Sequence, residues 1–207
     1  MTLHPVLQYL ITFPVLAISL TLHEFAHGWV AERCGDNTAK LAGRLTLNPF
    51  AHIDLWGTIF LPIFFILTLN TPFGWAKPVP VNFMNLRRPK SQMVWVAIAG
   101  PIANLFLATF FAALFHIGSI SPSSLLGSLL VLGSFLNLVL AVFNTIPLPP
   151  LDGSRIVMGL LPTPLLFYYR RLESFGFLIV IFLWATGLLD KVLLPAVSLL
   201  AKILGLF

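Results

Sequence analysis

The sequence predicts an all-α, polytopic transmembrane helix bundle with about four to six spans. Hydrophobic residues make up 58% of its 207 residues and charged residues only 9%. Soluble globular proteins carry about 25% charged residues, so this chain lacks the charge to cover an ordinary water-exposed surface. Long apolar runs are the third observation, and we consider them in order along the chain.

Five apolar runs are candidates for membrane-embedded helices. A spanning helix needs about 20 mainly apolar residues, and the first, third and fourth runs have this length. The second is shorter and contains Pro62. The runs cover residues 6–30, 55–69, 93–115, 125–146 and 175–189. The tail, residues 192–207, contains Pro195 and Lys202 and is expected to form a last span or an interfacial helix.

The basic residues act as topology signals, because they flank the apolar runs. They include Arg33, Lys40, Arg44, Lys77, Arg87, Arg88, Lys90, Arg155, Arg170 and Arg171. Although the net charge is +5, this placement argues against a nucleic-acid partner. Cytoplasmic loops are rich in Lys and Arg, and a full crossing by run 55–69 would split the clusters. We therefore expect a re-entrant or extended segment near residues 55–85, which is allowed where protein or water covers it.

A group of ionisable residues lies inside the first run. Residues 20–31 read LTLHEFAHGWVA and contain His23, Glu24 and His27. Ionisable groups at membrane depth are costly and mark functional sites. An HExxH sequence on a helix places two imidazoles one turn apart on one face, with a carboxylate beside them. Catalytic zinc sites use about three protein ligands, so the motif supplies two of them.

The third ligand has to come from elsewhere in the chain. Cys34 is the only cysteine, and most carboxylates flank the runs: Glu32, Asp36, Asp54, Glu173 and Asp190. We expect the first three of these to be solvated. Asp152 stands in NTIPLPPLDGSR, where prolines stop the preceding helix and Gly153 permits a turn. Taken alone, this sequence fits either a fixed ligand or an N-cap of a segment beginning near Ser154.

Depth favours Asp152 as the ligand. At 1.5 Å per residue, His23 lies roughly 25 Å beyond Val6, in the last third of an apolar core about 30 Å thick. Run 125–146 travels from outside to inside in the topology drawn above, so Asp152 emerges at the same face. We therefore expect His23, His27 and Asp152 to meet at the cytoplasmic side. His52 and His116 are expected to be structural or interfacial histidines.

These motifs together resemble the site-2 proteases, which are intramembrane zinc metalloproteases, and in particular the short form without PDZ or CBS domains. HEFAH resembles the first motif of the family and LDG the second, and GRLTLNP, GWAKPVPVN and AGPIAN follow the short-form pattern. The resemblance covers residues 20–156 and implies one zinc ion per chain, bound by His23, His27 and Asp152.

The resemblance also implies a function. The enzyme would hydrolyse peptide bonds within or near transmembrane segments of membrane-protein substrates, with a zinc-activated water and Glu24 as general base. Asn144 matches a family asparagine at the substrate or its oxyanion, and Asn104 one that packs helices or positions the site. The expected location is a prokaryotic plasma membrane, with the active site towards the cytoplasm.

The chain is expected to form a single intramembrane domain, residues 1–207, with a core of about 6–156 and C-terminal helices at 157–207. The sequence makes no prediction of an oligomeric state. Within the core, residues 77–82 read KPVPVN, which the prolines keep extended. This segment could pair with the backbone of an unwound substrate, or it could be a simple connecting loop.

Three other functions are less consistent with the sequence. A metal-ion transporter would place its ligands along a polar path on several helices, whereas the polar residues here concentrate at one depth. A non-catalytic scaffold would ordinarily have lost Glu24 or Asp152. A membrane zinc protease of the CAAX-processing type takes a downstream glutamate as third ligand, and here Glu173 has no motif around it.

Overall fold

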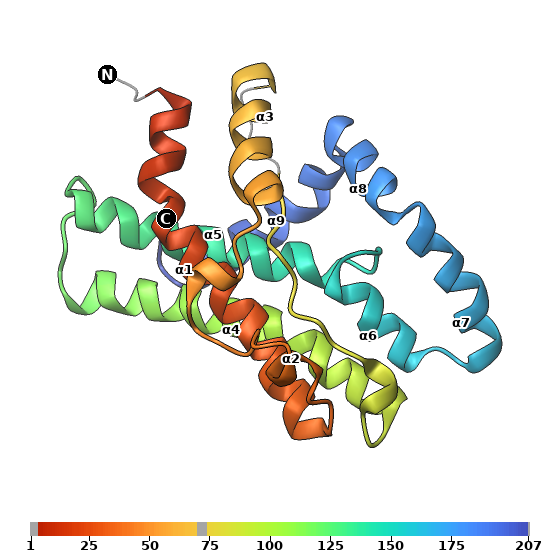
Figure 1. The fold of residues 1–207 in the computed structure, drawn as a ribbon. Helices are drawn as coiled ribbons and strands as arrows, with labels where there is room; N and C mark the ends of the chain where they lie inside the picture. The colour runs from red at the N-terminus through yellow and green to blue at the C-terminus, as the bar shows by residue number, and fades with distance from the viewer. Residues whose placement is uncertain (1–3, 70–73, 207) are drawn as a thin grey trace.

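The computed structural model describes residues 4–69 and 74–206, and these fold into helices joined by loops (Figure 1). No β-strand occurs among the described residues. The predicted all-α class is therefore confirmed.

Among the described residues, three helices are long and apolar enough to cross a membrane: α1 (Pro5–Cys34), α4 (Pro89–Ile117) and α5 (Leu125–Thr145). Two further helices, α8 (Gly176–Ala185) and α9 (Leu188–Ile203), are bent by 80° relative to each other and make a fourth span if counted together. This confirms a multi-pass helical membrane protein, at the lower end of the expected number of spans.

Local sequence explains where these helices begin and end. Both α1 and α4 have a proline in the first turn, where the missing N–H would have no intrahelical partner. Helix α1 ends at Gly35, whose φ of 113° is unfavourable for other residues. Gly187, with a φ of 68°, separates α8 from α9. This glycine divides the run at 175–189, which the sequence suggested was continuous.

The bundle core lies between α4, α5 and α9. Helices α4 and α5 run antiparallel, and α1 crosses them (Figure 1). Five residues of these helices form one buried apolar cluster: Ala108, Leu138, Leu193, Val197 and Ala201. The C-terminal tail, for which a span and an interfacial helix were both open, therefore packs its α9 against the bundle.

The chain leaves the bundle after residue 54 and returns before residue 77. A π-helical turn, η2 (Leu55–Phe60), continues into α3 (Leu61–Leu69). The backbone N–H of Trp75 then donates to the carbonyl of Gly57 at 3.0 Å, so the chain has turned back instead of crossing. Residues 70–73 of the expected re-entrant segment lie outside the described residues. The return path is extended up to η3 (Phe83–Asn85).

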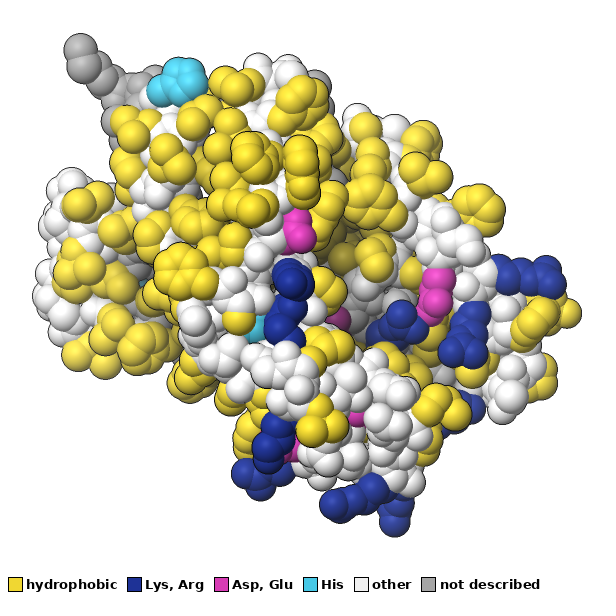
Figure 2. All heavy atoms as spheres, viewed as in Figure 1, with side chains coloured by type: hydrophobic (Ala, Val, Ile, Leu, Met, Phe, Trp, Pro, Cys, Tyr) yellow, Lys and Arg dark blue, Asp and Glu magenta, His cyan; other side chains and the backbone are white. Residues whose placement is uncertain are grey.

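Several short elements lie outside the five apolar runs, and those after residue 157 fall in the region where C-terminal helices were expected. They are α2 (Thr38–Leu41), η1 (Pro49–Ala51), α6 (Asp152–Leu160), α7 (Thr163–Arg170) and η4 (Arg171–Ser174). Figure 2 shows Lys and Arg side chains gathered over the lower and right-hand parts of this view, around α2, the start of α4 and α7. Apolar side chains cover the upper part, over the first half of α1, α3 and α8.

A fully buried polar network joins the three long helices. Asn104 on α4 donates through Nδ2 to Oδ1 of Asn137 on α5, at 2.8 Å. Asn137 in turn donates through its own Nδ2 to Oγ of Ser19 on α1, also at 2.8 Å. Interhelical hydrogen bonds of this kind contribute about 0.6–2 kcal/mol each in membrane proteins.

Replacing Asn137 tests this network. Asn137→Ala removes the close acceptor of the Asn104 amide, which keeps only a 3.5 Å contact with the carbonyl of Ser19, and it removes the donor to the Ser19 hydroxyl. We therefore expect the free energy of unfolding to fall by about 1–3 kcal/mol. The measurement is reversible unfolding in mixed micelles. Ser128→Ala, at an exposed position of the same helix, is the control and should change stability by less than about 0.5 kcal/mol. Equal effects of the two changes would exclude a stabilising role for the network.

Candidate metal centre and active site

Two imidazoles and one carboxylate converge where α1 meets the start of α6. Nε2 of His23 and Nε2 of His27 lie 3.0 Å apart. Oδ2 of Asp152 lies 3.1 Å from the first of these atoms and 3.2 Å from the second. Within residues 4–69 and 74–206, this is the one group of three or more His, Cys, Asp or Glu side chains that could hold a metal ion.

The far side of each imidazole is held by α4. Nδ1 of His23 lies 2.5 Å from Oδ1 of Asn104, and Nδ1 of His27 lies 2.7 Å from the carbonyl oxygen of Val96. The Val96 oxygen is a backbone carbonyl and can only accept. The Asn104 atom that faces His23 is also an acceptor oxygen, because the amide nitrogen of Asn104 donates to Asn137. Each Nδ1 therefore carries the proton and donates it, which leaves the lone pair of Nε2 directed at the cluster.

The space beside the two imidazoles depends on a glycine of α4. A Cβ atom at Gly100 would lie 2.4 Å from Nε2 of His27 and 2.6 Å from Nε2 of His23. Any other residue would therefore displace the two rings. The HExxH spacing gave no sign of this requirement, since Gly100 is about 75 residues further along the chain.

Asp152 is positioned by the turn between α5 and α6. Helix α6 begins at Asp152 itself, so the carboxylate stands in its first turn and does not cap a helix beginning near Ser154. A Cβ atom at Gly153 would lie 2.3 Å from the carbonyl oxygen of Thr145, which shows how closely α6 starts against the end of α5.

The donor set fits a catalytic zinc ion. Zinc bonds of about 2.0–2.2 Å in a tetrahedral arrangement place ligand atoms roughly 3.3–3.6 Å apart, and the three separations here, 3.0, 3.1 and 3.2 Å, are only slightly shorter. Two imidazole nitrogens and one carboxylate oxygen also match the three-ligand sites that leave one position for water. His23, His27 and Asp152 are thus suited to bind zinc without rearrangement of the helices.

The other two residues that the sequence assigned to the site occupy different places. Glu24 is half-buried, and its Oε2 accepts the backbone N–H of Val79 at 2.7 Å. This contact joins α1 to the extended segment 77–82. Asn144 lies near the end of α5, where its Nδ2 donates to the carbonyl of Leu140 at 3.0 Å. Its observed hydrogen bond is therefore within its own helix and does not involve the cluster.

One expectation about the remaining carboxylates was wrong. Asp36 is not solvated: it is fully buried and accepts hydrogen bonds from Thr38, Asn85 and the backbone N–H of Asn82. Burial raises the pKa of Asp36, but the hydrogen-bond donors together lower this pKa by a larger amount. The pKa of Asp36 therefore lies below its usual value. Proximity to basic residues in sequence suggested solvation, whereas local donors replace the water.

The other candidate ligands have structural contacts. His52 is buried, with Nε2 2.9 Å from the carbonyl oxygen of Thr46. Nε2 of His116 lies 2.9 Å from the carbonyl oxygen of Leu204. Glu32 pairs with Lys40 at 2.8 Å, and Glu173 with Arg155 at 2.6 Å. These contacts fit the structural roles expected for the two histidines.

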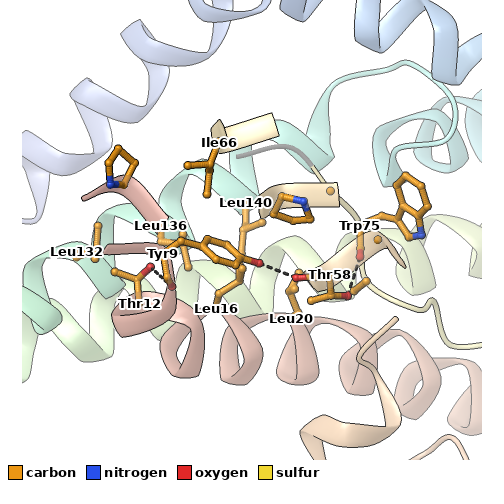
Figure 3. A pocket seen from close by; sticks show the side chains of 15 residues that line it. Tyr9, Thr12, Leu16, Leu20, Thr58, Ile66, Trp75, Leu132, Leu136 and Leu140 are labelled. Carbon is orange, nitrogen blue, oxygen red and sulfur yellow. Dashed lines mark hydrogen bonds between the residues drawn. The ribbon is translucent and has the colours of Figure 1, made fainter. Parts of the chain in front are cut away.

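An apolar cavity of about 440 Å³ lies between α1, α3 and α5 (Figure 3). One wall is a stripe on α1 that includes Tyr9, Thr12, Leu16 and Leu20, and another is a stripe on α5 formed by Leu132, Leu136 and Leu140. Residues four apart share a helix face. The first stripe therefore continues to Glu24 and the second to Asn144, so the cavity leads towards the polar cluster.

The rim of the cavity near η2 is held by two hydrogen bonds (Figure 3). The hydroxyl of Tyr9 donates to the carbonyl of Thr58 at 2.6 Å, and Oγ1 of Thr58 donates to the carbonyl of Trp75 at 2.9 Å. Trp75 lies just before the extended segment that contacts Glu24. The third wall of the cavity is therefore also continuous with the site.

Sequence comparison with known proteins identifies the family of this chain. The profile of peptidase family M50 matches residues 11–127. YwhC of Bacillus subtilis, named as a candidate zinc metalloprotease, is 42% identical over 88% of this chain and 84% of its own length. The Rip2 protein of Mycolicibacterium smegmatis, with the same kind of name, is 31% identical over 84% of this chain and 66% of its own length.

No solved structure matches the chain significantly. The family match covers more than half of the sequence, and it includes the HExxH helix and the helix that supports both imidazoles. The chain therefore belongs to peptidase family M50, the site-2 protease family, and is a multi-pass membrane zinc metalloprotease.

Proposed function

We propose that this protein is an intramembrane endopeptidase that hydrolyses peptide bonds within or near transmembrane segments of membrane proteins. The observation that carries the proposal is the cluster of His23, His27 and Asp152, which is built on a membrane-spanning helix with Glu24 beside it. A polar cluster at membrane depth is costly, and the three side chains are arranged as a set of metal ligands. We assign the whole activity to one domain with its core at about residues 6–156.

Each residue has a distinct role in this proposal. His23, His27 and Asp152 would hold zinc, which when bound lowers the pKa of a water molecule to about 7 and polarises a carbonyl group. Glu24 takes a proton from the attacking water as its oxygen bonds to the peptide carbon. The C–N bond then breaks, and Glu24 returns the proton to the leaving amine nitrogen. Asn144 is assigned to the substrate carbonyl side, at the end of the α5 stripe.

The apolar cavity supports a transmembrane substrate. Leucines form its α5 wall, and Leu16 and Leu20 form part of its α1 wall. By helical spacing, the two stripes continue to Glu24 and Asn144. An apolar peptide segment placed there would bury its side chains while one of its ends reached the metal ligands. A helical substrate would have to unwind locally, because its own hydrogen bonds shield the peptide group.

Orientation follows from the distribution of charge. The basic side chains lie over the ends of α1 and α4 nearest the cluster and over α7 (Figure 2). Cytoplasmic loops are enriched in Lys and Arg, so we assign this side to the cytoplasm of a prokaryotic cell. The cluster then faces the cytoplasmic half of the plasma membrane.

The role of Glu24 is tested by Glu24→Gln. Glutamine keeps an oxygen that can accept the N–H of Val79 but cannot take up the proton, so we expect cleavage of a single-span substrate to fall by about 100- to 10,000-fold. Bound zinc, measured by atomic emission, should remain at the wild-type level. Glu32→Gln, in the ion pair with Lys40, is the control. Wild-type cleavage by Glu24→Gln would rule out Glu24 as the base.

The third ligand is tested by Asp152→Asn. An amide oxygen lacks the charge that a zinc ligand supplies, so we expect the zinc affinity to fall at least about tenfold. Competition with a chromogenic chelator measures this affinity. Asp190→Asn, at an exposed position in the first turn of α9, should leave it unchanged. An unaltered affinity in Asp152→Asn would remove Asp152 from the ligand set.

The cavity is tested by filling it. Leu136→Trp adds side-chain volume to the α5 wall, and overpacking of this kind costs about 1–3 kcal/mol, so we expect kcat/KM for an apolar single-span substrate to fall about tenfold or more. Zinc content should not change. Leu126→Trp, at an exposed position on the same helix, is the control. If the two tryptophan variants cleave equally well, the substrate does not use this cavity.

A further inference from the structure

The extended segment 77–82 is attached at two points, to the proposed general base on α1 and to Asp36 in the loop that follows α1. The N–H of Val79 donates to Oε2 of Glu24 at 2.7 Å. Three residues later, the N–H of Asn82 donates to Oδ2 of Asp36 at 2.7 Å. Between the two contacts the chain passes through Pro80, whose φ is fixed by its ring. The position of the Val79 amide is therefore tied to that of Asn82.

Side-chain packing holds the same register. Val79 is 7% exposed, and it lies against Gly28, where a Cβ atom would be 3.0 Å from Cγ1 of Val79. Gly28 is one turn after Glu24 on α1. A shift of the segment along α1 would thus move both the valine side chain and the amide that contacts the glutamate.

Asp36 is the central acceptor at the far end of this segment. It stands just after the C-terminal residue of α1, and its Oδ1 accepts hydrogen bonds from the backbone N–H of Thr38 at 3.1 Å, from the Thr38 hydroxyl, and from Nδ2 of Asn85 at 3.0 Å. No Lys or Arg within the described part of the chain forms an ion pair with it. A buried carboxylate is costly unless hydrogen-bonded, so these donors are tightly committed to it.

The described part of the segment has few other backbone hydrogen bonds that hold its position. Pro78 and Pro80 have no backbone N–H. The N–H of Lys77 donates to the carbonyl of His52 at 3.0 Å, and Nη2 of Arg44 donates to the carbonyl of Lys77 at 3.0 Å. These contacts secure only the start of the segment. Beyond Val79, two kinds of contact secure the end of the segment: the Asn82 N–H donates to Asp36, and the Val81 side chain packs against the buried cluster of Ala31, Leu86 and Val96. Of these, only the contact with Asp36 is a hydrogen bond from the backbone of the segment.

We propose that Asp36 is a positioning residue for Glu24: by holding the end of segment 77–82, it fixes the Val79 amide that orients the glutamate carboxylate. This inference rests on the proposed role of Glu24 as the base. It gives segment 77–82 a function distinct from both substrate pairing and simple connection. The backbone N–H groups of Lys77, Val79 and Asn82 already donate to acceptors within the protein. In this proposal, the main role of the segment is therefore to orient Glu24.

Asp36→Asn tests the proposal with little change in shape. The carboxylate of Asp36 receives donors on both oxygens, and an asparagine can accept on only one, so its amide nitrogen must face a donor. We expect kcat for a single-span substrate to fall about 10- to 100-fold, as a misplaced catalytic group does. KM should stay within about twofold and zinc content should not change, because neither the cavity nor the ligands are altered.

Hydrogen exchange gives a second measurement that needs no cleavage. Pro78 and Pro80 carry no amide hydrogen, so a peptide covering this segment reports mainly on the amides of Val79, Val81 and Asn82. We expect exchange there to become at least about tenfold faster in Asp36→Asn, while α5 and α9 keep wild-type protection. Glu32→Gln, at the same end of α1 but paired with Lys40, should leave exchange and kcat unchanged.

A milder variant guards against general misfolding. Asn85→Ala removes one donor and keeps the carboxylate, so it should give a smaller change in the same direction in both measurements. Unchanged protection of segment 77–82 in Asp36→Asn would overturn the proposal, whether or not the wild type cleaves. A loss of kcat accompanied by loss of zinc, or matched by Glu32→Gln, would also overturn it. If the wild-type protein cleaves no substrate, the proposed function is rejected. Faster exchange of segment 77–82 in Asp36→Asn would in that case still show that Asp36 holds the segment.

Discussion

The structure depends on keeping two imidazoles and a carboxylate in contact inside a membrane-spanning helix bundle. Such groups are stable at this depth only if every polar atom has a partner. The partners come from two elements that are distant in sequence from the HExxH helix: α4 provides Asn104 and the carbonyl of Val96, and the start of α6 provides Asp152. The crossing of α1 over α4 is therefore a requirement of the cluster as well as of apolar packing, and Gly100 sets how closely these helices approach.

The same constraint extends from the cluster into the bundle. Asn104 can hold His23 in one tautomer only while its own amide nitrogen is engaged, and Asn137 provides that partner. Asn137 then depends on Ser19, which returns the network to α1 one turn before His23. Polar atoms in a low-dielectric interior are costly singly and stabilising as a complete network. Helix packing and the orientation of the proposed metal ligands are thus parts of one arrangement.

The long helices, the turning segment and the HExxH part of the site could be predicted from the sequence. Each depends on residue types or residue spacing that can be read within a single stretch of chain. Apolar length indicated α1, α4 and α5, and charge placement indicated that residues 55–69 turn back. The rule that ionisable groups in lipid need a reason identified His23, Glu24 and His27. It did not identify Asn137, because the rule was applied only to residues that can be charged, although a buried amide has the same need for partners.

Other features depended on contacts that a single sequence does not contain. The burial of Asp36 follows from donors on Asn82 and Asn85, which are almost fifty residues away. Gly187 is a common residue for a helix break, but the 80° bend between α8 and α9 needs the packing of α9 on the bundle. Long-range pairing of this kind is settled by tertiary structure, which overrides local patterns.

The arrangement separates the two tasks of a hydrolytic metal site. The proposed ligands stand on α1 and at the start of α6, where close packing leaves little freedom. The carboxylate of Glu24 is instead oriented by the amide of Val79, in a connecting segment that two prolines make stiff. The carboxylate of Glu24, the proposed base, can therefore change its orientation when this segment is displaced. The proposed ligands, which are held by packed helices, cannot. Metal affinity and base orientation should therefore be separable by mutation, even though Glu24 immediately follows a proposed ligand in the sequence.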